Sequence, residues 1–412
     1  MRVRYSQPFR VRGPYLREGV SLILELIELE EKYGSGVYPK VPLRLVRGEG
    51  AKVWDSEGKE YIDCVGGHGV GVVGHSNPYV LDAIFNQAKK LIICSETFYH
   101  EERALLYKEL LEVMPDYMGS VFLCNSGAEA VEAAIKFARL LTGRKRIVAL
   151  KRAFHGRTFG ALSATWNPKY REPFEPLVPE FVHVDPEDKE GLRSLINEEV
   201  AGFIFEVVQG EGGVYPLSED FLRFAQELCR RSGALFIADE IQTGFCRTGR
   251  FFAFQRYGLS PDMVCLAKGM AGGLPIGAVV LRDSLGKLPQ RVHGSTFGGN
   301  PLSCAAARAS IRFMKENSLD ERAESLGKLF LEGLKAIDSP LVKDVRGLGL
   351  MIGMELKRRS APYLKALAEE GVLALQAGPT VIRFLPPLII SEGEVDFVVE
   401  KVRKVLSRDE SD

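Results

Sequence analysis

Residues 234–244 read Ala-Leu-Phe-Ile-Ala-Asp-Glu-Ile-Gln-Thr-Gly, an apolar run that ends in two adjacent carboxylates and a loop. The apolar residues 234–238 predict a strand that is buried on both faces. A helix is predicted directly before it, because Ser218 can cap the first turn and Gly233 follows the last turn. This pattern favours an α/β sheet, in which ligands bind at the carboxyl ends of the strands. Asp239 therefore lies where a ligand is expected.

Similar short apolar runs recur through the middle of the chain and alternate with helical patterns. They are residues 121–124, 146–150, 202–206, 263–266 and 277–281. This alternation predicts a mainly parallel central sheet with helices on its faces.

The two ends of the chain have different patterns. Residues 43–64 read as a hairpin, and the residues after about 305 read as helices and strands of a smaller α+β domain. We therefore expect three parts. They are an N-terminal segment, 1–70, that joins the small domain, a large domain, 71–305, and a C-terminal small domain, 306–412.

The composition argues against several classes of protein. Lys plus Arg and Asp plus Glu both number 54, so the formal net charge is zero and neither nucleic acid nor an anionic membrane is an expected partner. The seven cysteines form no C-x-x-C pair, which argues against zinc and suits reduced thiols in a cytoplasmic protein. The apolar stretch 21–29 contains two glutamates, so we expect an amphipathic helix there and not a signal sequence or a membrane span.

Two glycine-containing motifs are candidates for phosphate binding. Asn125-Ser-Gly-Ala-Glu129 lies between a predicted strand and an amphipathic helix, where small residues let an anion approach free backbone N–H groups. An ordinary strand-to-helix turn would explain this motif equally well. Gly69–Gly74 forms a G-x-G-x-x-G pattern, but Pro78 and the residues before it delay any helix, so we interpret it as a loop and not as a dinucleotide site.

Lys268 follows a predicted buried strand and precedes several glycines. Burying an ammonium is costly, so such a lysine is paired, lowered in pKa or used covalently, for instance in a Schiff base. The alternative is a lysine at the exposed end of a strand. If the two strands are parallel neighbours, Lys268 and Asp239 share one crevice. A lysine, an acid and a phosphate-binding turn are what pyridoxal phosphate (PLP) enzymes require.

Several segments of the sequence resemble the class III aminotransferases, the ornithine and acetylornithine type. They occur in the family's order over nearly the whole chain: Asn125-Ser-Gly-Ala-Glu-Ala130, Phe154-His-Gly-Arg-Thr158, Gln209-Gly-Glu-Gly-Gly213, Asp239-Glu-Ile-Gln-Thr-Gly244, Ala267-Lys-Gly269, His293-Gly-Ser-Thr-Phe-Gly-Gly-Asn-Pro301 and Arg383-Phe-Leu-Pro-Pro387. One departure is Val207, where a proline is usual after the acid. The resemblance implies a PLP-dependent aminotransferase of PLP fold type I, with a large domain and a smaller α+β domain.

The resemblance implies roles for residues that contact the cofactor ring. Lys268 forms the Schiff base and then acts as base and acid in the proton shift. Asp239 pairs with the pyridine nitrogen, and Gln242 hydrogen-bonds the ring hydroxyl. Phe154 stacks on the ring, while Glu206 orders the surrounding residues.

The resemblance also implies how the cofactor phosphate is bound. The turn Ser126-Gly127-Ala128 holds it, with backbone N–H groups from Gly127 and Ala128. Thr296 reaches the phosphate in the neighbouring subunit, so we expect a homodimer with shared active sites.

Four further residues match positions that bind substrate in the family. Arg383 binds the α-carboxylate of glutamate or 2-oxoglutarate, and Glu211 pairs with this arginine when no dicarboxylate is present. Arg157 and Tyr38 hold the carboxylate of the second substrate. His155 is given a structural role, without any part in the chemistry.

Three other segments resemble the branch of lysine and arginine biosynthesis that works on an amino-group carrier protein. They are Glu60-Tyr-Ile-Asp-Cys-Val-Gly-Gly67, Thr165-Trp-Asn-Pro-Lys-Tyr-Arg-Glu-Pro173 and Leu373-Ala-Leu-Gln-Ala-Gly-Pro-Thr-Val-Ile-Arg383. This resemblance implies a substrate lysine or ornithine whose α-amino group is linked to the carrier's C-terminal glutamate. Such carriers are acidic, so basic residues are candidates for docking: Arg2, Arg4, Arg10, Arg12, Lys40, Arg44 and Arg47.

Other functions are alternatives to this interpretation. An N-acetylornithine or acetyl-lysine aminotransferase that acts on free substrate would share all of these residues, so the sequence leaves it open. A PLP decarboxylase or glutamate semialdehyde mutase needs no dicarboxylate switch, and Arg383 with Glu211 argues against both. A non-catalytic homologue predicts the loss of Lys268 or Asp239, and both residues are present.

Overall fold

A computed structural model describes residues 20–408, and the chain divides into two compact units. Within the described residues, the first unit comprises 20–47 and 54–60, and the second comprises 48–53 and 61–408. The helix expected near the N-terminus is present in the first unit as α1 (Val20–Tyr33). The hairpin expected over residues 43–64 is present as three strands, β1 (Leu45–Glu49), β2 (Lys52–Asp55) and β3 (Glu60–Asp63).

The second unit contains a seven-stranded sheet with the strand order β4-β12-β11-β10-β7-β5-β6. Its strands are β4 (Met118–Cys124), β5 (Arg146–Leu150), β6 (Phe181–Val184), β7 (Val200–Phe205), β10 (Leu235–Asp239), β11 (Met263–Leu266) and β12 (Gly277–Arg282). Five of them run parallel side by side, and β12 is antiparallel to both of its neighbours. The predicted mainly parallel α/β sheet is therefore confirmed, and β6 is the strand that the sequence pattern missed.

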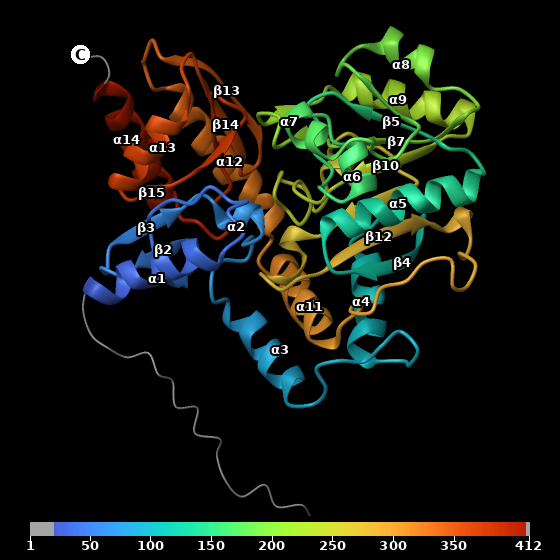
Figure 1. Cartoon of the computed structure of the whole chain (residues 1–412), viewed down its shortest axis with the longest axis horizontal. Helices are drawn as coiled ribbons and strands as arrows, with labels where there is room; N and C mark the ends of the chain where they lie inside the picture. The colour runs from blue at the N-terminus through green and yellow to red at the C-terminus, as the bar shows by residue number, and fades with distance from the viewer. Residues whose placement is uncertain (1–19, 409–412) are drawn as a thin grey trace, which may run out of the picture. The chain divides into compact units, whose positions relative to one another are not determined.

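Alternate residues of these strands enter two different hydrophobic clusters, as expected for a sheet that is covered on both faces. In β10, Ile237 packs in the cluster formed with helix α5 (Gly127–Thr142). Phe236 and Ala238 enter the larger cluster on the other face, which includes residues of α9 (Glu219–Ser232). Figure 1 shows α5 lying across β12 and β4. The buried apolar runs in the sequence thus reflect burial from both sides.

Three more helices pack together beside this sheet. They are α3 (Pro78–Ala88), α4 (Glu101–Glu112) and α11 (Pro301–Glu316), the last of which contacts both of the others. Residues 70–74, which follow the short helix α2 (Gly66–Gly69), form turns and irregular backbone before α3, so the loop interpretation of this glycine pattern is confirmed.

The C-terminal part of the second unit contains a four-stranded sheet with the order β13-β14-β17-β16. Its strands are β13 (Val342–Leu348), β14 (Met351–Leu356), β16 (Leu375–Ala377) and β17 (Val381–Phe384), and its helices are α12 (Leu319–Lys335), α13 (Ala361–Glu369) and α14 (Glu392–Arg408). A separate parallel pairing joins β15 (Val372–Leu373) to Ile62 and Asp63 of β3.

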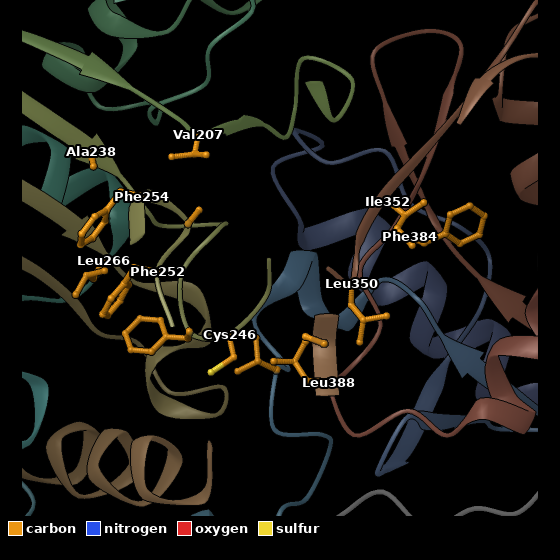
Figure 2. Close-up of a cluster of buried hydrophobic side chains, with 14 of the residues drawn as sticks. Val207, Ala238, Cys246, Phe252, Phe254, Leu266, Leu350, Ile352, Phe384 and Leu388 are labelled. Carbon is orange, nitrogen blue, oxygen red and sulfur yellow. The ribbon is translucent and has the colours of Figure 1, made fainter. Parts of the chain in front are cut away.

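One hydrophobic cluster includes side chains of both sheets of the second unit. Figure 2 shows it extending from Ala238 and Leu266 past Cys246 to Leu350 and Phe384. The two sheets therefore share a core. The division into residues 1–70, 71–305 and 306–412 stays a prediction. Between residues 20 and 408, no helix combines the length and the apolar character that crossing a membrane requires.

Candidate active site

A cavity of about 400 Å³ lies beside the carboxyl ends of β10 and β11. Asp239 is the last residue of β10, and it pairs in register with Cys265 of the parallel strand β11. Lys268 follows β11 by two residues, so both side chains reach the same edge of the sheet. The cavity is lined by eight of the residues predicted from the sequence: Ser126, Gly127, Ala128, Phe154, Arg157, Asp239, Gln242 and Lys268.

Asp239 is held by two hydrogen-bonding partners. Its Oδ1 accepts a hydrogen bond of 3.0 Å from the backbone N–H of Ile241, and its Oδ2 lies 2.7 Å from Nδ1 of His155. Burial alone would lower the pKa of His155, but the hydrogen bond and charge of Asp239, together with Glu206, raise it. The contact thus favours the protonated form of His155.

The contact with Asp239 is the feature of His155 that sequence reasoning missed. The available signal was its position directly after Phe154 in a matched motif. A histidine ring fully buried beside a site carboxylate orients that carboxylate, so the structural role expected for His155 includes direct positioning of a site residue.

Glu206 supports the same wall of the cavity. Its Oε2 accepts a hydrogen bond of 3.0 Å from the backbone N–H of Phe154. Burial raises the pKa of Glu206 to about 7, and the nearby negative charge of Asp239 adds to this shift. This contact agrees with the ordering role predicted for Glu206, which stays a prediction.

Lys268 opens a short 3-10 turn and is held in a left-handed backbone conformation, with φ of 26°. Burial lowers its pKa, although the charges of Glu211 and Asp239 oppose this. Among the described residues, no carboxylate comes within 4.0 Å of its ammonium. Burial therefore favours the neutral amine, which is the nucleophilic form.

The turn before α5 presents free backbone N–H groups to the cavity. Ser126 caps the helix, and its Oγ accepts a hydrogen bond of 3.2 Å from the N–H of Glu129. Close packing fixes this turn, because a Cβ on Gly277 would lie 2.3 Å from the carbonyl oxygen of Ser126. A Cβ on Gly127 would lie 2.8 Å from Ile241. A helix N-terminus held in this way is suited to an anion.

Arg383 and Glu211 form an ion pair next to the cavity. Nη1 of Arg383, on β17, lies 2.7 Å from Oε1 of Glu211 and 3.1 Å from Oε1 of Gln242. Burial raises the pKa of Glu211, but the charge of Arg383 and its hydrogen bond outweigh this and lower it. Gln242 lines the cavity, so it links the ion pair to the other site residues.

The remaining predicted residues lie in different places. The guanidinium of Arg157 lies 4.4 Å from the ring centroid of Tyr170 and 5.9 Å from that of Phe154. Thr296 is exposed and does not line the cavity in this chain. Tyr38 belongs to the first unit and its side chain is 75% exposed, so its role stays a prediction.

The basic residues expected to help docking fall into two groups. Lys40, Arg44 and Arg47 are in the first unit, where Lys40 pairs with Glu30 at 2.8 Å and Arg47 lies over the Trp54 ring. The other residues lie outside the described part of the chain: Arg2, Arg4, Arg10 and Arg12.

The family model for class-III aminotransferases matches residues 33–406. The chain belongs to the class III aminotransferase family. This aminotransferase is 50% identical over 384 residues to the [LysW]-aminoadipate semialdehyde transaminase of Deinococcus radiodurans, covering 92% of this chain and 89% of that one. It is 46% identical over 382 residues to the acetylornithine aminotransferase of Methanopyrus kandleri, covering 92% and 98%.

A solved structure shows the same fold. The ornithine aminotransferase of Toxoplasma gondii, with PLP partly occupying its active site, matches with a TM-score of 0.90 and 33% identity, over 94% of this chain and 95% of that one. Enzymes of this family depend on PLP, and this chain is a PLP-dependent transaminase of fold type I. The buried carboxylate of Asp239, the buried amine of Lys268 and the anion-binding turn at Ser126 suit the ring nitrogen, aldehyde and phosphate of PLP.

Proposed function

We propose that this aminotransferase exchanges the terminal amino group of a carrier-linked lysine or ornithine with 2-oxoglutarate, in lysine and arginine biosynthesis. The similarity to the Deinococcus radiodurans enzyme supports this assignment, because its name describes a [LysW]-linked semialdehyde. A related enzyme of Sulfurisphaera tokodaii, 44% identical over 365 residues, is named as a [LysW]-aminoadipate semialdehyde/glutamate semialdehyde transaminase. The second name is consistent with activity on both chain lengths.

The ion pair between Arg383 and Glu211 is the observation that carries the reaction scheme. A transaminase binds two substrates in turn at one site. Here one substrate is a dicarboxylate, and the other is an amine or aldehyde with no carboxylate on the reacting carbon. With glutamate present, Arg383 binds its α-carboxylate, and Glu211 moves away. With the second substrate, Glu211 neutralises Arg383, so no buried charge is left without a partner.

The residues at the edge of the sheet divide the chemistry among them. PLP supplies an electron sink, because its protonated ring withdraws electrons from the carbon that bears the amino group. Asp239, oriented by His155, keeps the ring nitrogen protonated. Lys268 removes a proton from the substrate carbon and then donates it as the acid in the proton shift that completes amino-group transfer. The residues that hold the cofactor are Ser126, Gly127, Ala128, Phe154, Asp239, Gln242 and Lys268, together with Thr296 from a second subunit.

A homodimer is part of this proposal. Thr296 is exposed and lies outside the cavity of its own chain, as a residue that serves a neighbouring site would. Large apolar side chains are also exposed between α3 and α4 and next to Thr296: Leu91, Ile92, Ile93, Phe98, Tyr99 and Phe297. A surface of this kind suits contact with a second copy. The cysteines of the described residues are all free, which fits the cytoplasm.

An aminotransferase acting on free N-acetylornithine is the second candidate. It is favoured by the 46% identity to the Methanopyrus kandleri enzyme over 92% of this chain. The two functions use the same catalytic residues and differ only in what is attached to the α-amino group.

The deciding experiment is a half-reaction with glutamate, followed by a screen of acceptors. The enzyme in its amine form is mixed with the semialdehyde that corresponds to free acetylornithine, to free acetyl-lysine or to the carrier-linked substrate, and the return of visible cofactor absorbance is timed. A faster rate with the carrier-linked compound supports the first candidate. A faster rate with the semialdehyde of free acetylornithine refutes it. A Lys268→Ala variant is the blank for both half-reactions.

A further inference from the structure

We propose that the groove lined by Arg152, Lys169 and Arg359 holds the acidic C-terminal polypeptide of the carrier, with its last residue at the cofactor cavity. This inference rests on the proposed function, because it locates the partner that the proposal requires. The groove has a volume of about 700 Å³ and is separate from the cofactor cavity of about 400 Å³.

Five separate stretches of the second unit line this groove, and three of them carry its cations. Arg152 follows β5. Trp166 precedes α7 (Pro168–Arg171), and Tyr170 lies in that helix. Arg359 precedes α13 beside the C-terminal sheet. In Figure 1, α7 lies next to the strands of the C-terminal sheet. The groove therefore lies where loops of the large sheet meet the smaller sheet.

The groove and the cofactor cavity share a wall. Phe154 lines both of them, and Glu211, the ion-pair partner of Arg383, lines the groove. A polypeptide lying in the groove would thus end beside the residues that are proposed to bind substrate. A free acylated amino acid has no polymer chain to occupy this additional volume.

The charges of the groove select an acidic occupant. Arg152, Lys169 and Arg359 are all exposed, and within the described part of the chain none of them forms an ion pair with a carboxylate. Glu211 is the single carboxylate among the lining residues, and Arg383 already neutralises it. The groove therefore presents three cations without compensating charge, which favours an anionic chain.

Aromatic rings hold part of this charge in place. The guanidinium of Arg152 lies 4.4 Å from the ring centroid of Tyr215, and its backbone is left-handed, with φ of 66°. The guanidinium of Arg157 lies 4.4 Å from the ring centroid of Tyr170, at the boundary between groove and cavity. Arginines fixed on rings lose little freedom on binding a carboxylate, so they suit a recognition surface.

The test uses the full-length holoenzyme and a double variant, Lys169→Glu with Arg359→Glu. The matched control is Lys335→Glu with Lys365→Glu, which makes the same change in net charge at exposed lysines outside the groove. The probe is a synthetic acidic peptide whose C-terminal glutamate side chain is linked to the α-amino group of lysine. A second peptide carries norleucine in place of that lysine, so that binding can be measured without turnover.

We expect the groove variant to raise KM for the lysine-bearing peptide and Kd for the norleucine peptide at least about tenfold, with weaker salt dependence of both. The ratio of kcat/KM for peptide-linked to free acetyl-lysine should fall by a similar factor. The control variant should shift both constants about twofold or less. Equal constants in the groove and control variants would overturn the groove assignment, even if the wild type uses the peptide well. A wild type that turns over free acylated substrate but not the peptide would instead refute the proposed function.

Discussion

Nδ1 of His155 lies 2.7 Å from Oδ2 of Asp239, and both side chains are buried at the end of β10. The strand thus ends in a carboxylate with both oxygens in contact. One oxygen faces His155, and the other accepts a hydrogen bond from the backbone N–H of Ile241. This arrangement fixes the direction of the Asp239 carboxyl group. It is also the basis of a prediction about pH.

The pKa of His155 in the folded chain is raised above its ordinary value of 6.5 by Asp239. The contribution of protonated His155 to the stability of the folded chain is therefore complete below about pH 6.5. This contribution is lost as the pH rises through the pKa of His155 in the folded chain. We predict that His155→Gln lowers the free energy of unfolding of the cofactor-free chain by about 1–3 kcal/mol at pH 6 and by less at pH 9. Urea unfolding of the wild type and the variant at both pH values measures this difference in the free energy of unfolding. A difference that is larger at pH 9 than at pH 6 contradicts the prediction.

Arg383→Gln should raise KM for glutamate about 10- to 100-fold, because a charged hydrogen bond contributes about 1.5–3 kcal/mol. Glu211→Gln should lower KM for glutamate, because this change releases Arg383 from its ion-pair partner. Steady-state kinetics with both substrates measure the two changes. Arg231→Gln, which breaks an exposed ion pair on α9, is the control. The ion pair has no switching role if both site variants change KM for glutamate in the same direction.

Gly277→Ala should weaken PLP binding about tenfold or more, because its Cβ would lie 2.3 Å from the Ser126 carbonyl and displace the turn before α5. Titration of the apoenzyme with PLP measures the affinity. Gly393→Ala is the matched control, since a Cβ there meets nothing within 4 Å. Unchanged affinity in Gly277→Ala would show that this turn does not bind the phosphate.

Glu240→Ala should destabilise the chain by about 2–4 kcal/mol without removing any residue of the cavity lining. The buried carboxylate accepts hydrogen bonds from the hydroxyl of Thr243 and from the backbone N–H groups of Ala253 and Phe254, and alanine leaves these donors without an acceptor. Thermal unfolding measures the loss. Glu227→Ala, at a partly exposed position on α9, should cost much less. Equal losses in the two variants would argue against the role of Glu240.

Sequence periodicity was sufficient for the large sheet, because strands covered on both faces leave continuous apolar runs. It missed β6, which is only partly buried and so carries a weaker signal. The cavity was predictable because Asp239 and Lys268 follow neighbouring parallel strands. The contact between His155 and Asp239 was not, since it depends on the path of a loop 84 residues away along the chain. The groove was also hidden, because its cations come from three separate stretches.

The ion pair of Arg383 with Glu211 has one more consequence. In the proposed reaction scheme, Glu211 is a carboxylate held within reach of the arginine that binds glutamate, so it would compete with glutamate for Arg383. A tethered group acts at a high effective concentration that no dilution of the enzyme can change. The response to glutamate is therefore adjusted by the strength of an internal contact, and a change at one of these two residues would retune the enzyme to a different cellular concentration of its amino donor.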